Sequence, residues 1–387
     1  MSARGLDRRD ALALGAGAVL LPYASAAVAR TEAGSAPAAT GRDQPFNDGW
    51  LFHRGLADGL EAVSASDSGW RRIDLPHDWS IEDVPGDEKA IGPFTETAVG
   101  NTATGFTVGG EGWYRKHFNL AGVPRDAGVE IEFDGVYCEC DVWLNGVHLV
   151  THHHGYAPFA ADLTPHLVRD GGNVLAVRVR NLGRNSRWYS GSGIYREVRL
   201  HVMPAGARFA RWGIGAWTRR IAGGAAEVEV TTRIDDADPT AQLVSRLRDA
   251  QGRVVATATS PASGEIKQVL AVRGAHLWSP TDPYLHTLES ELQRGGKAVD
   301  RVVQPYGLRI VTIDPQRGLA INGERTVLRG GCIHHDNGLL GACAYPQADE
   351  RRIRLLKARG FNAIRSSHNP ASRSLRSACD RLGMLMI

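Results

Sequence analysis

Two histidine-bearing loops near the C-terminal end constrain the fold of this chain more than any other feature. The first loop carries the sequence HHD at 334–336, and an apolar β-branched run from Thr326 to Leu328 leads into it. A helical pattern from Gln347 to Arg359 then leads to a second predicted strand from Phe361 to Arg365. This order predicts a βαβ unit. Because parallel strands place their chemistry outside their carboxyl ends, we expect both loops on the same side.

The predicted helix has two distinct faces. Ile353 and Leu356 lie three residues apart on the apolar face, and Gly360 follows the last turn as a C-cap residue. The other face carries basic residues, which are Arg351, Arg352, Arg354 and Lys357.

A second helix and the beginning of a third strand complete the C-terminal pattern. The helix is predicted from Ser372, a suitable N-cap, to Leu382, with Gly383 as its stop. Residues 384–387 begin an apolar strand, within which the sequence ends. A (β/α)8 barrel takes roughly 250 residues, so we expect either the first part of such a barrel or a smaller fold.

The composition excludes several classes of protein. A chain of 387 residues with 43% hydrophobic and 22% charged residues has room for two or three soluble domains. The net charge of +3 comes without a basic block that includes aromatic residues, so we expect no nucleic-acid partner. The five cysteines have neither zinc-site nor disulfide-framework spacing. Cys138 and Cys140 lie two apart on a predicted strand, and we interpret them as core residues.

The first residues read as an export signal. Arg8 and Arg9 precede an apolar stretch from Ala11 to Leu21, and a run of small residues ends at Ala29. This pattern predicts a secretory signal over 1–29, and the paired arginines favour the twin-arginine route. The apolar stretch is shorter than the roughly 20 residues that span a bilayer. The alternative is a plain basic N-terminus. We expect a linker at 30–43 and a periplasmic or secreted protein.

Two all-β segments follow the linker. In the segment 44–204, alternating strands surround Asn145-Gly146, a strong signal for a hairpin with a type I′ turn. Its many short antiparallel strands predict a sandwich or jelly roll. In the segment 205–311, alternation over 227–234 and turn-spaced strands predict an immunoglobulin-like sandwich. We expect the remaining residues, 312–387, to form the αβ part.

Eight stretches of the sequence, in order, resemble glycoside hydrolase family 2, and within it the β-galactosidase-like members. They are LPHDWSIE at Leu75, GEGWYRKHF at Gly110, FDGVYCECDVWLNG at Phe133, RWYSGSGIYREV at Arg187, LWSPTDPYLHTLE at Leu277, YGLRIV at Tyr306, LRGGCIHHD at Leu328 and FNAIRSSHNP at Phe361. The resemblance implies a jelly-roll sugar-binding domain, an immunoglobulin-like domain and the start of a TIM barrel. It also implies a glycoside hydrolase that releases terminal β-linked galactose with retention of configuration.

The resemblance also implies which residues contact the sugar. The family's matching positions line the pocket for the terminal sugar, and they give as candidates His334, His335, Asp336, Arg365, His368, Asn369 and, more weakly, Arg187. Such side chains orient sugar hydroxyls by hydrogen bonds. The alternative is that they merely cap the barrel mouth, and that the aromatic residues after Arg187 serve packing.

The catalytic carboxyl groups implied by the resemblance follow the fourth and seventh barrel strands, whereas this sequence ends in the third. We therefore assign no catalytic residue and expect the 387-residue chain to be inactive by itself. We expect no cofactor or metal, and an oligo- or polysaccharide substrate with a terminal β-galactoside as partner. The run His152 to His154 reads as a solvated loop, because consecutive strand residues cannot converge on one ion.

Two other interpretations stay open. One is a β-glucuronidase- or β-mannosidase-type glycosidase, against which the HHDNG loop at His334 favours galactosidase. The other is a non-catalytic carbohydrate-binding fragment made of the β domains.

Overall fold

The computed structural model describes residues 42–84, 86–184, 186 and 188–387. The predicted export signal at 1–29 and most of the predicted linker lie outside the described residues. The first strand begins at Asp43, and Arg42 before it donates a hydrogen bond to the carbonyl oxygen of Phe209 at 2.7 Å. The last two residues of the expected linker thus belong to the folded part. No helix among the described residues is long and apolar enough to cross a membrane.

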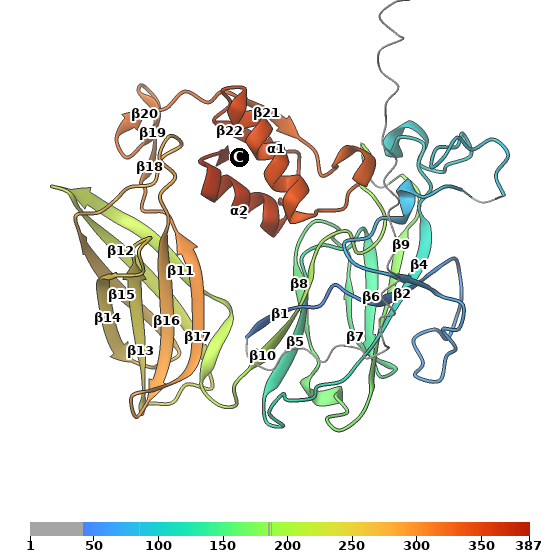
Figure 1. Ribbon diagram of the computed structural model, residues 1–387, viewed down its shortest axis with the longest axis horizontal. Helices are drawn as coiled ribbons and strands as arrows, with labels where there is room; N and C mark the ends of the chain where they lie inside the picture. The colour runs from blue at the N-terminus through green and yellow to red at the C-terminus, as the bar shows by residue number, and fades with distance from the viewer. Residues whose placement is uncertain (1–41, 85, 185, 187) are drawn as a thin grey trace, which may run out of the picture. The chain divides into compact units, whose positions relative to one another are not determined.

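The N-terminal part of the described chain is a jelly-roll sandwich of two antiparallel sheets, with strand orders β1-β10-β5-β8 and β3-β2-β4-β9-β6-β7 (Figure 1). The strands of this sandwich are β1 Asp43–Pro45, β2 Trp50–Arg54, β3 Arg71–Ile73, β4 Gly110–Phe118, β5 Gly128–Phe133, β6 Glu139–Leu144, β7 Val147–His152, β8 Phe159–Asp162, β9 Asn173–Asn181 and β10 Val198–Met203. Short 3-10 helices lie between them: η2 Trp79–Ile81, η3 Asn101–Thr104 and η4 Thr164–His166.

Local sequence explains the hairpin of β6 and β7. Asn145 and Gly146 both adopt positive φ, at 52° and 81°, as a type I′ turn requires. The side chain of Asn145 also accepts a hydrogen bond from the amide of Val174 at 2.9 Å. Cys140 is fully buried in the core, whereas Cys138 is partly buried. The hairpin is therefore as predicted, and the interpretation of the two cysteines as core residues is correct for Cys140 but not for Cys138.

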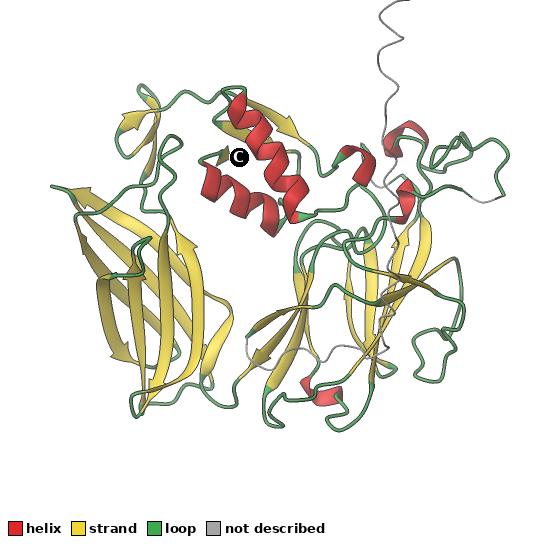
Figure 2. Cartoon of the chain, viewed as in Figure 1, coloured by secondary structure: helices red, strands yellow, loops and turns green. Residues whose placement is uncertain are grey.

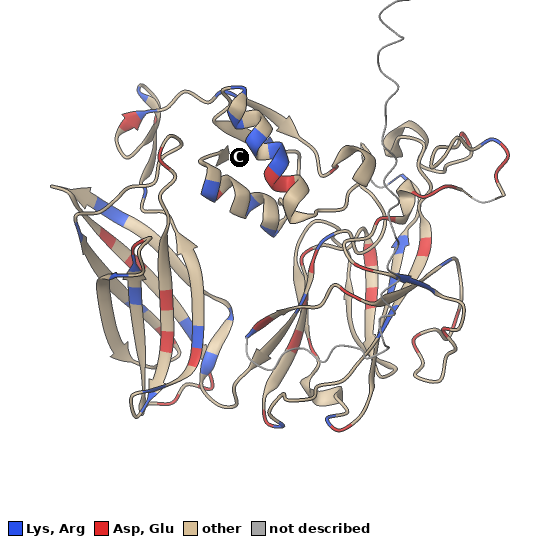
Figure 3. Cartoon of the chain, in the orientation of Figure 1, with Lys and Arg blue, Asp and Glu red and all other residues tan. Residues whose placement is uncertain are grey.

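The second sandwich is immunoglobulin-like and has the sheets β11-β12-β15 and β14-β13-β16-β17. Its strands are β11 Arg208–Ala222, β12 Ala225–Asp235, β13 Ala241–Arg248, β14 Val254–Pro261, β15 Glu265–Arg273, β16 His286–Arg294 and β17 Lys297–Tyr306. Charged residues also lie on its strands (Figure 3). Glu289 on β16 pairs with Arg246 and Arg248 on β13 and with Arg301 on β17. The buried faces of the strands specify their register, and these cross-strand ion pairs stabilise the same register.

The C-terminal part is the beginning of a TIM barrel, and it holds both α-helices of the described residues (Figure 2). A small antiparallel sheet precedes it, made of β18 Val311–Asp314, β19 Gly318–Ile321 and β20 Glu324–Arg325. The elements of the barrel segment are β21 Gly330–Ile333, η5 Gly338–Leu340, α1 Pro346–Ala358, β22 Ala363–Ser366, α2 Arg373–Leu382 and β23 Leu385–Met386. The strands β21, β22 and β23 form a parallel sheet, which confirms the predicted βαβ order.

The first barrel strand lies later than its sequence suggested. Residues 326–328 are not in a strand, and β21 instead covers the glycine-containing run Gly330–Ile333. A Cβ atom on Gly330 would lie 2.1 Å from the carbonyl oxygen of Ala363. The close approach of β21 to β22 needs glycine there, so a tertiary contact overrides the β propensity of the earlier run. The prediction for 326–328 was wrong for that reason.

The helices follow the prediction more closely. Ser372 caps α2 by accepting a hydrogen bond from the amide of Leu375 at 3.1 Å, and Gly383 ends it with φ of 71°. Apolar residues of both helices and of the sheet then form one core, which contains Ile353, Ile364, Leu375, Cys379 and Met384.

Candidate functional site

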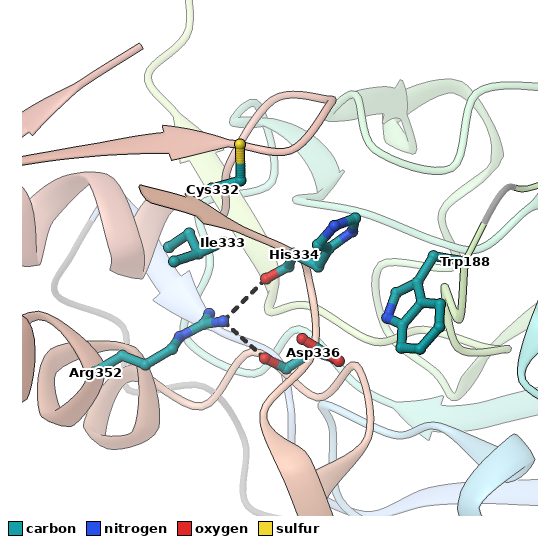
Figure 4. A pocket seen from close by; sticks show the side chains of 6 residues that line it. All are labelled: Trp188, Cys332, Ile333, His334, Asp336 and Arg352. Carbon is teal, nitrogen blue, oxygen red and sulfur yellow. Dashed lines mark hydrogen bonds between the residues drawn. The ribbon is translucent and has the colours of Figure 1, made fainter. Parts of the chain in front are cut away.

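A pocket of about 520 Å³ opens at the carboxyl end of β21 (Figure 4). Its lining residues come from the barrel segment except for one tryptophan of the jelly roll: Trp188, Cys332, Ile333, His334, Asp336 and Arg352. In αβ barrels the carboxyl ends of the strands carry the reacting groups. We therefore take this pocket, at the carboxyl end of the first barrel strand, as the candidate site.

Arg352 on α1 fixes the shape of the first loop. Its Nη1 atom donates to the carbonyl oxygens of His334 at 2.9 Å and Asp336 at 2.7 Å (Figure 4). Its Nη2 atom donates to Asp349 at 3.0 Å. The backbone carbonyl groups of His334 and Asp336 thus both have a hydrogen-bond donor. Sequence reasoning missed this role, because Arg352 is one of several basic residues on one helix face and nothing local distinguishes it.

His334 and Asp336 are the sequence-predicted residues that line the pocket. The ring of His334 lies 5.6 Å from the ring of His368 in an edge-to-face arrangement. It also lies 6.3 Å from the ring of Trp188, whose side chain is 49% exposed. Sugar rings present an apolar face and a belt of hydroxyls, so an aromatic wall beside imidazole and carboxylate groups suits them.

His335 points away from this pocket. Its ring packs 4.7 Å from the ring of Tyr156, and its Nδ1 atom lies 3.5 Å from a guanidinium nitrogen of Arg196. It lines a separate cavity of about 10 Å³, which is the volume one water molecule needs. Burial and then the neighbouring charge of Arg196 lower the pKa of His335 to about 3, so the ring is neutral at physiological pH. This environment supports the loop and gives His335 no direct route to a ligand in the larger pocket.

Arg365 lies on β22, and His368 and Asn369 follow this strand, beside the pocket. A guanidinium nitrogen of Arg365 hydrogen-bonds Nδ1 of His368 and lies 3.9 Å from the sulfur of Cys332. The side chains of Arg365 and His368 are exposed, and that of Asn369 is partly buried. The carbonyl oxygen of Asn369 accepts a hydrogen bond from the hydroxyl of Ser366 at 2.8 Å. The structure thus brings His334, His368 and Arg365 together.

Arg187, the remaining predicted residue, lies outside the described residues. Its neighbour Trp188 reaches the pocket from the loop between β9 and β10. The next residue, Tyr189, donates a hydrogen bond to Asp78. Burial and then the charge of Asp78 raise the pKa of Tyr189 well above its ordinary value, so the phenol stays protonated.

A second jelly-roll residue supports the loop after β22. Arg196 is 1% exposed, and it donates to the carbonyl oxygens of Pro370 at 2.8 Å and Tyr156 at 3.0 Å. Arg196 belongs to the family-specific stretch GIYREV, so the sequence singled out this part of the chain. The sequence could not show its partner, because Pro370 is 174 residues away.

The described residues contain no cluster of three or more His, Cys, Asp or Glu side chains arranged to hold a metal ion. The run of histidines at 152–154 diverges: His152 stacks on Phe159 at 4.2 Å, and His153 lies 3.1 Å from Glu139.

Three sequence profiles of one family match consecutive parts of this chain. They are the sugar binding domain of Glycosyl hydrolases family 2 at residues 62–204, Glycosyl hydrolases family 2 at 217–309, and the TIM barrel domain of the same family at 312–387. The chain belongs to glycosyl hydrolase family 2. The resemblance seen in the sequence is thereby confirmed.

Relatives of this family 2 chain carry two kinds of name. "Beta-galactosidase BoGH2A" of Bacteroides ovatus is 39% identical over 354 residues, covering 88% of this chain and 40% of that protein. A "Putative beta-glucuronidase" of Formosa agariphila is 32% identical over 345 residues, covering 88% of this chain and 32% of that protein. The chain spans less than half the length of these relatives.

Solved structures of family 2 proteins share the fold. A glycosyl hydrolase family 2 member from Bacteroides cellulosilyticus matches with a TM-score of 0.85 and 42% identity, over 89% of this chain and 45% of that one. A beta-glucuronidase from glycoside hydrolase family 2 matches with a TM-score of 0.79 and 27% identity, over 89% of this chain and 39% of that one.

Proposed function

We propose that the full-length protein hydrolyses terminal β-linked galactose with retention of configuration. The observation that carries this proposal is the 39% identity to a protein named beta-galactosidase over 354 residues. Relatives named beta-glucuronidase are 25% to 32% identical, and other relatives named beta-galactosidase are 28% to 30% identical. The single highest identity among them therefore favours the galactoside.

The chemistry of the pocket is consistent with a neutral sugar. Trp188 offers an aromatic surface for the apolar face of a sugar ring, while His334 and Asp336 offer hydrogen-bonding groups for its hydroxyls. Asp336 and Arg352 bring one charge of each sign to the lining, so a sugar that carries no charge needs no further ionic partner there.

We propose that the 387-residue chain alone binds the sugar without hydrolysing it at an enzymatic rate. Retaining hydrolysis needs two carboxyl groups about 5 Å apart. Asp336 carries the one carboxyl group among the described residues that line the pocket. The nearby carboxylate of Asp349 is buried and accepts hydrogen bonds from Ser372 at 2.6 Å and Ser374 at 2.5 Å, so it has no access to a substrate.

A β-glucuronidase is the second candidate, because several relatives carry that name and because Arg365 is exposed beside the pocket. Its guanidinium group could pair with the carboxylate of a glucuronide by two parallel hydrogen bonds. Under this alternative, Arg365 would be the residue that selects the substrate.

The test is a panel of nitrophenyl β-galactoside, β-glucuronide and β-mannoside on the full-length protein and on its Arg365→Gln variant. We expect turnover of the galactoside to exceed that of the others. Turnover confined to the glucuronide and lost in Arg365→Gln would establish the second candidate instead. Sugar binding without turnover of any glycoside by the full-length protein would favour a carbohydrate-binding protein.

A further inference from the structure

The carboxylate of Asp78 lies where a loop of the jelly roll meets a loop of the barrel segment. Asp78 is 2% exposed and caps η2. Its Oδ1 atom accepts hydrogen bonds from the backbone amides of Ser80 at 3.0 Å and Ser192 at 2.8 Å. Its Oδ2 atom accepts from the backbone amide of Ala342 at 2.9 Å and from the hydroxyl of Tyr189. One carboxylate therefore joins three separate segments of the chain.

Glycines allow this close approach. A Cβ atom on Gly341 would lie 2.5 Å from Oδ2 of Asp78, and one on Gly191 would lie 2.5 Å from the Cβ atom of Ala342. Side chains at these two positions would push the loops apart. Glycine at both positions lets the two backbones donate to the same carboxylate.

Both loops continue into walls of the pocket. Trp188, which lines the pocket, is the residue before Tyr189. On the barrel side, the amide of Asn337 donates to the carbonyl oxygen of Gly341 at 2.7 Å, and its side-chain amide donates to the carbonyl oxygen of Cys343 at 3.0 Å. The loop that presents Asp336 is thus tied to the residues that contact Asp78.

We propose that Asp78 is a positioning residue, whose carboxylate holds Trp188 and Asp336 at the relative positions that a terminal sugar requires. Asp78 itself does not line the pocket. The inference rests on the proposed function, since it takes the pocket to be a sugar site. It adds that a residue of the jelly roll sets the geometry of a site at the barrel mouth.

The substitution Asp78→Asn tests this idea selectively. The amide oxygen can take the place of Oδ1 and keep the hydrogen bonds from Ser80 and Ser192. The NH₂ group would then occupy the position of Oδ2. The hydroxyl of Tyr189 can rotate to accept from it, but the amide of Ala342 cannot. The variant therefore releases the barrel loop while it keeps the contacts within the jelly roll.

Asp141→Asn is the matched control. Asp141 lies in the same domain, is 5% exposed, and hydrogen-bonds the side chains of Arg178 at 2.9 Å and Thr151 at 2.5 Å. The substitution Asp141→Asn makes the same chemical change as Asp78→Asn in a carboxylate of similar burial. Asp141 lies on strand β6, outside both loops.

The experiment uses the 387-residue chain at a temperature where every variant is folded. Titration calorimetry gives the Kd for isopropyl 1-thio-β-galactoside, and hydrogen exchange gives the protection of the Ala342 amide. For Asp78→Asn we expect Kd to rise about tenfold or more and the Ala342 amide to exchange at least about tenfold faster, as for loss of a hydrogen bond to a charged acceptor. For Asp141→Asn we expect both quantities to stay unchanged, although its unfolding midpoint falls.

The two readouts separate failure of the inference from failure of the proposed function. An unchanged Kd in Asp78→Asn, or an equal rise in the control, would overturn the positioning role. If the unsubstituted chain does not bind the thiogalactoside, the proposed sugar site is contradicted. The hydrogen exchange of the Ala342 amide then tests by itself whether Asp78 anchors the barrel loop. Faster exchange at Ala342 in Asp78→Asn would support it, and unchanged exchange would overturn it.

Discussion

Replacement of Glu132 by glutamine should weaken the attachment of the three domains to one another. Glu132 on β5 is 2% exposed and pairs with Arg211 on β11 at 2.8 Å and with Arg373 at the start of α2. Nε2 of His201 lies 3.3 Å from the same carboxylate. One buried charge therefore contacts basic groups from the jelly roll, the immunoglobulin-like sandwich and the barrel segment.

The magnitude follows from the pKa of Glu132. Burial alone would raise it, but the contact with the His201 ring and the charges of Arg373 and Arg211 lower it from 4.5 to about 2. At 1.36 kcal/mol for each unit of pKa, the ionised group contributes about 3 kcal/mol of folding stability. Because the folded-state pKa is depressed, this contribution is complete well above pH 4.5 and is lost as the pH falls toward 2.

We expect Glu132→Gln to lower the free energy of unfolding by about 3 kcal/mol at pH 7 and by about 1 kcal/mol at pH 3. Urea unfolding of the 387-residue chain, followed by tryptophan fluorescence at both pH values, measures the difference. Glu130→Gln is the matched control, since Glu130 lies on the same strand, pairs with Arg211 and has a side chain 23% exposed. A partly solvated pair of this kind contributes about 1 kcal/mol or less.

The reasoning would be refuted if Glu132→Gln lowered the free energy of unfolding by the same amount at pH 7 and at pH 3. Such a result would mean that Glu132 stabilises the fold by packing, which does not depend on pH. A loss equal to that of Glu130→Gln would refute it as well.

Three further outcomes are expected. We propose that the protein is exported and that its mature form begins near residue 30; N-terminal sequencing of extracytoplasmic material that returned Met1 would contradict this. In the full-length protein, His368→Ala should slow β-galactoside turnover about two- to tenfold, because Nδ1 of His368 accepts a hydrogen bond from Arg365 and an uncharged hydrogen bond from the ring to a sugar hydroxyl contributes about 0.5 to 1.5 kcal/mol; unchanged kinetics with a nitrophenyl β-galactoside would mean that His368 only caps the barrel. Limited proteolysis should cut first near Val311, because β18 is exposed along its whole length and Ile313 is 82% exposed; earlier cleavage within the jelly roll would argue against it.

The sequence by itself determined the secondary structure where local rules are strict. The positive φ of Asn145 and Gly146, the cap at Ser372 and the stop at Gly383 all follow from the conformations that single residues prefer. The alternation along β12 gives its buried face directly, since every second side chain of a strand points the same way. Family-specific stretches then indicated the order of the domains, and the rule for parallel strands indicated the end of the barrel at which the pocket lies.

The tertiary structure decided which residues of those stretches reach the pocket. His334 and His335 are adjacent and chemically identical, yet one lines the pocket while the other is buried against Tyr156 and Arg196. Arg352 and Asp78 form hydrogen bonds with residues on other segments of the chain. Asp78 and its partner Ala342 are 264 residues apart in the sequence. A pattern read along the chain reports what a residue prefers. Which partner satisfies a buried charge depends on segments that meet only after folding, and that pairing is the part of the site that the sequence does not encode locally.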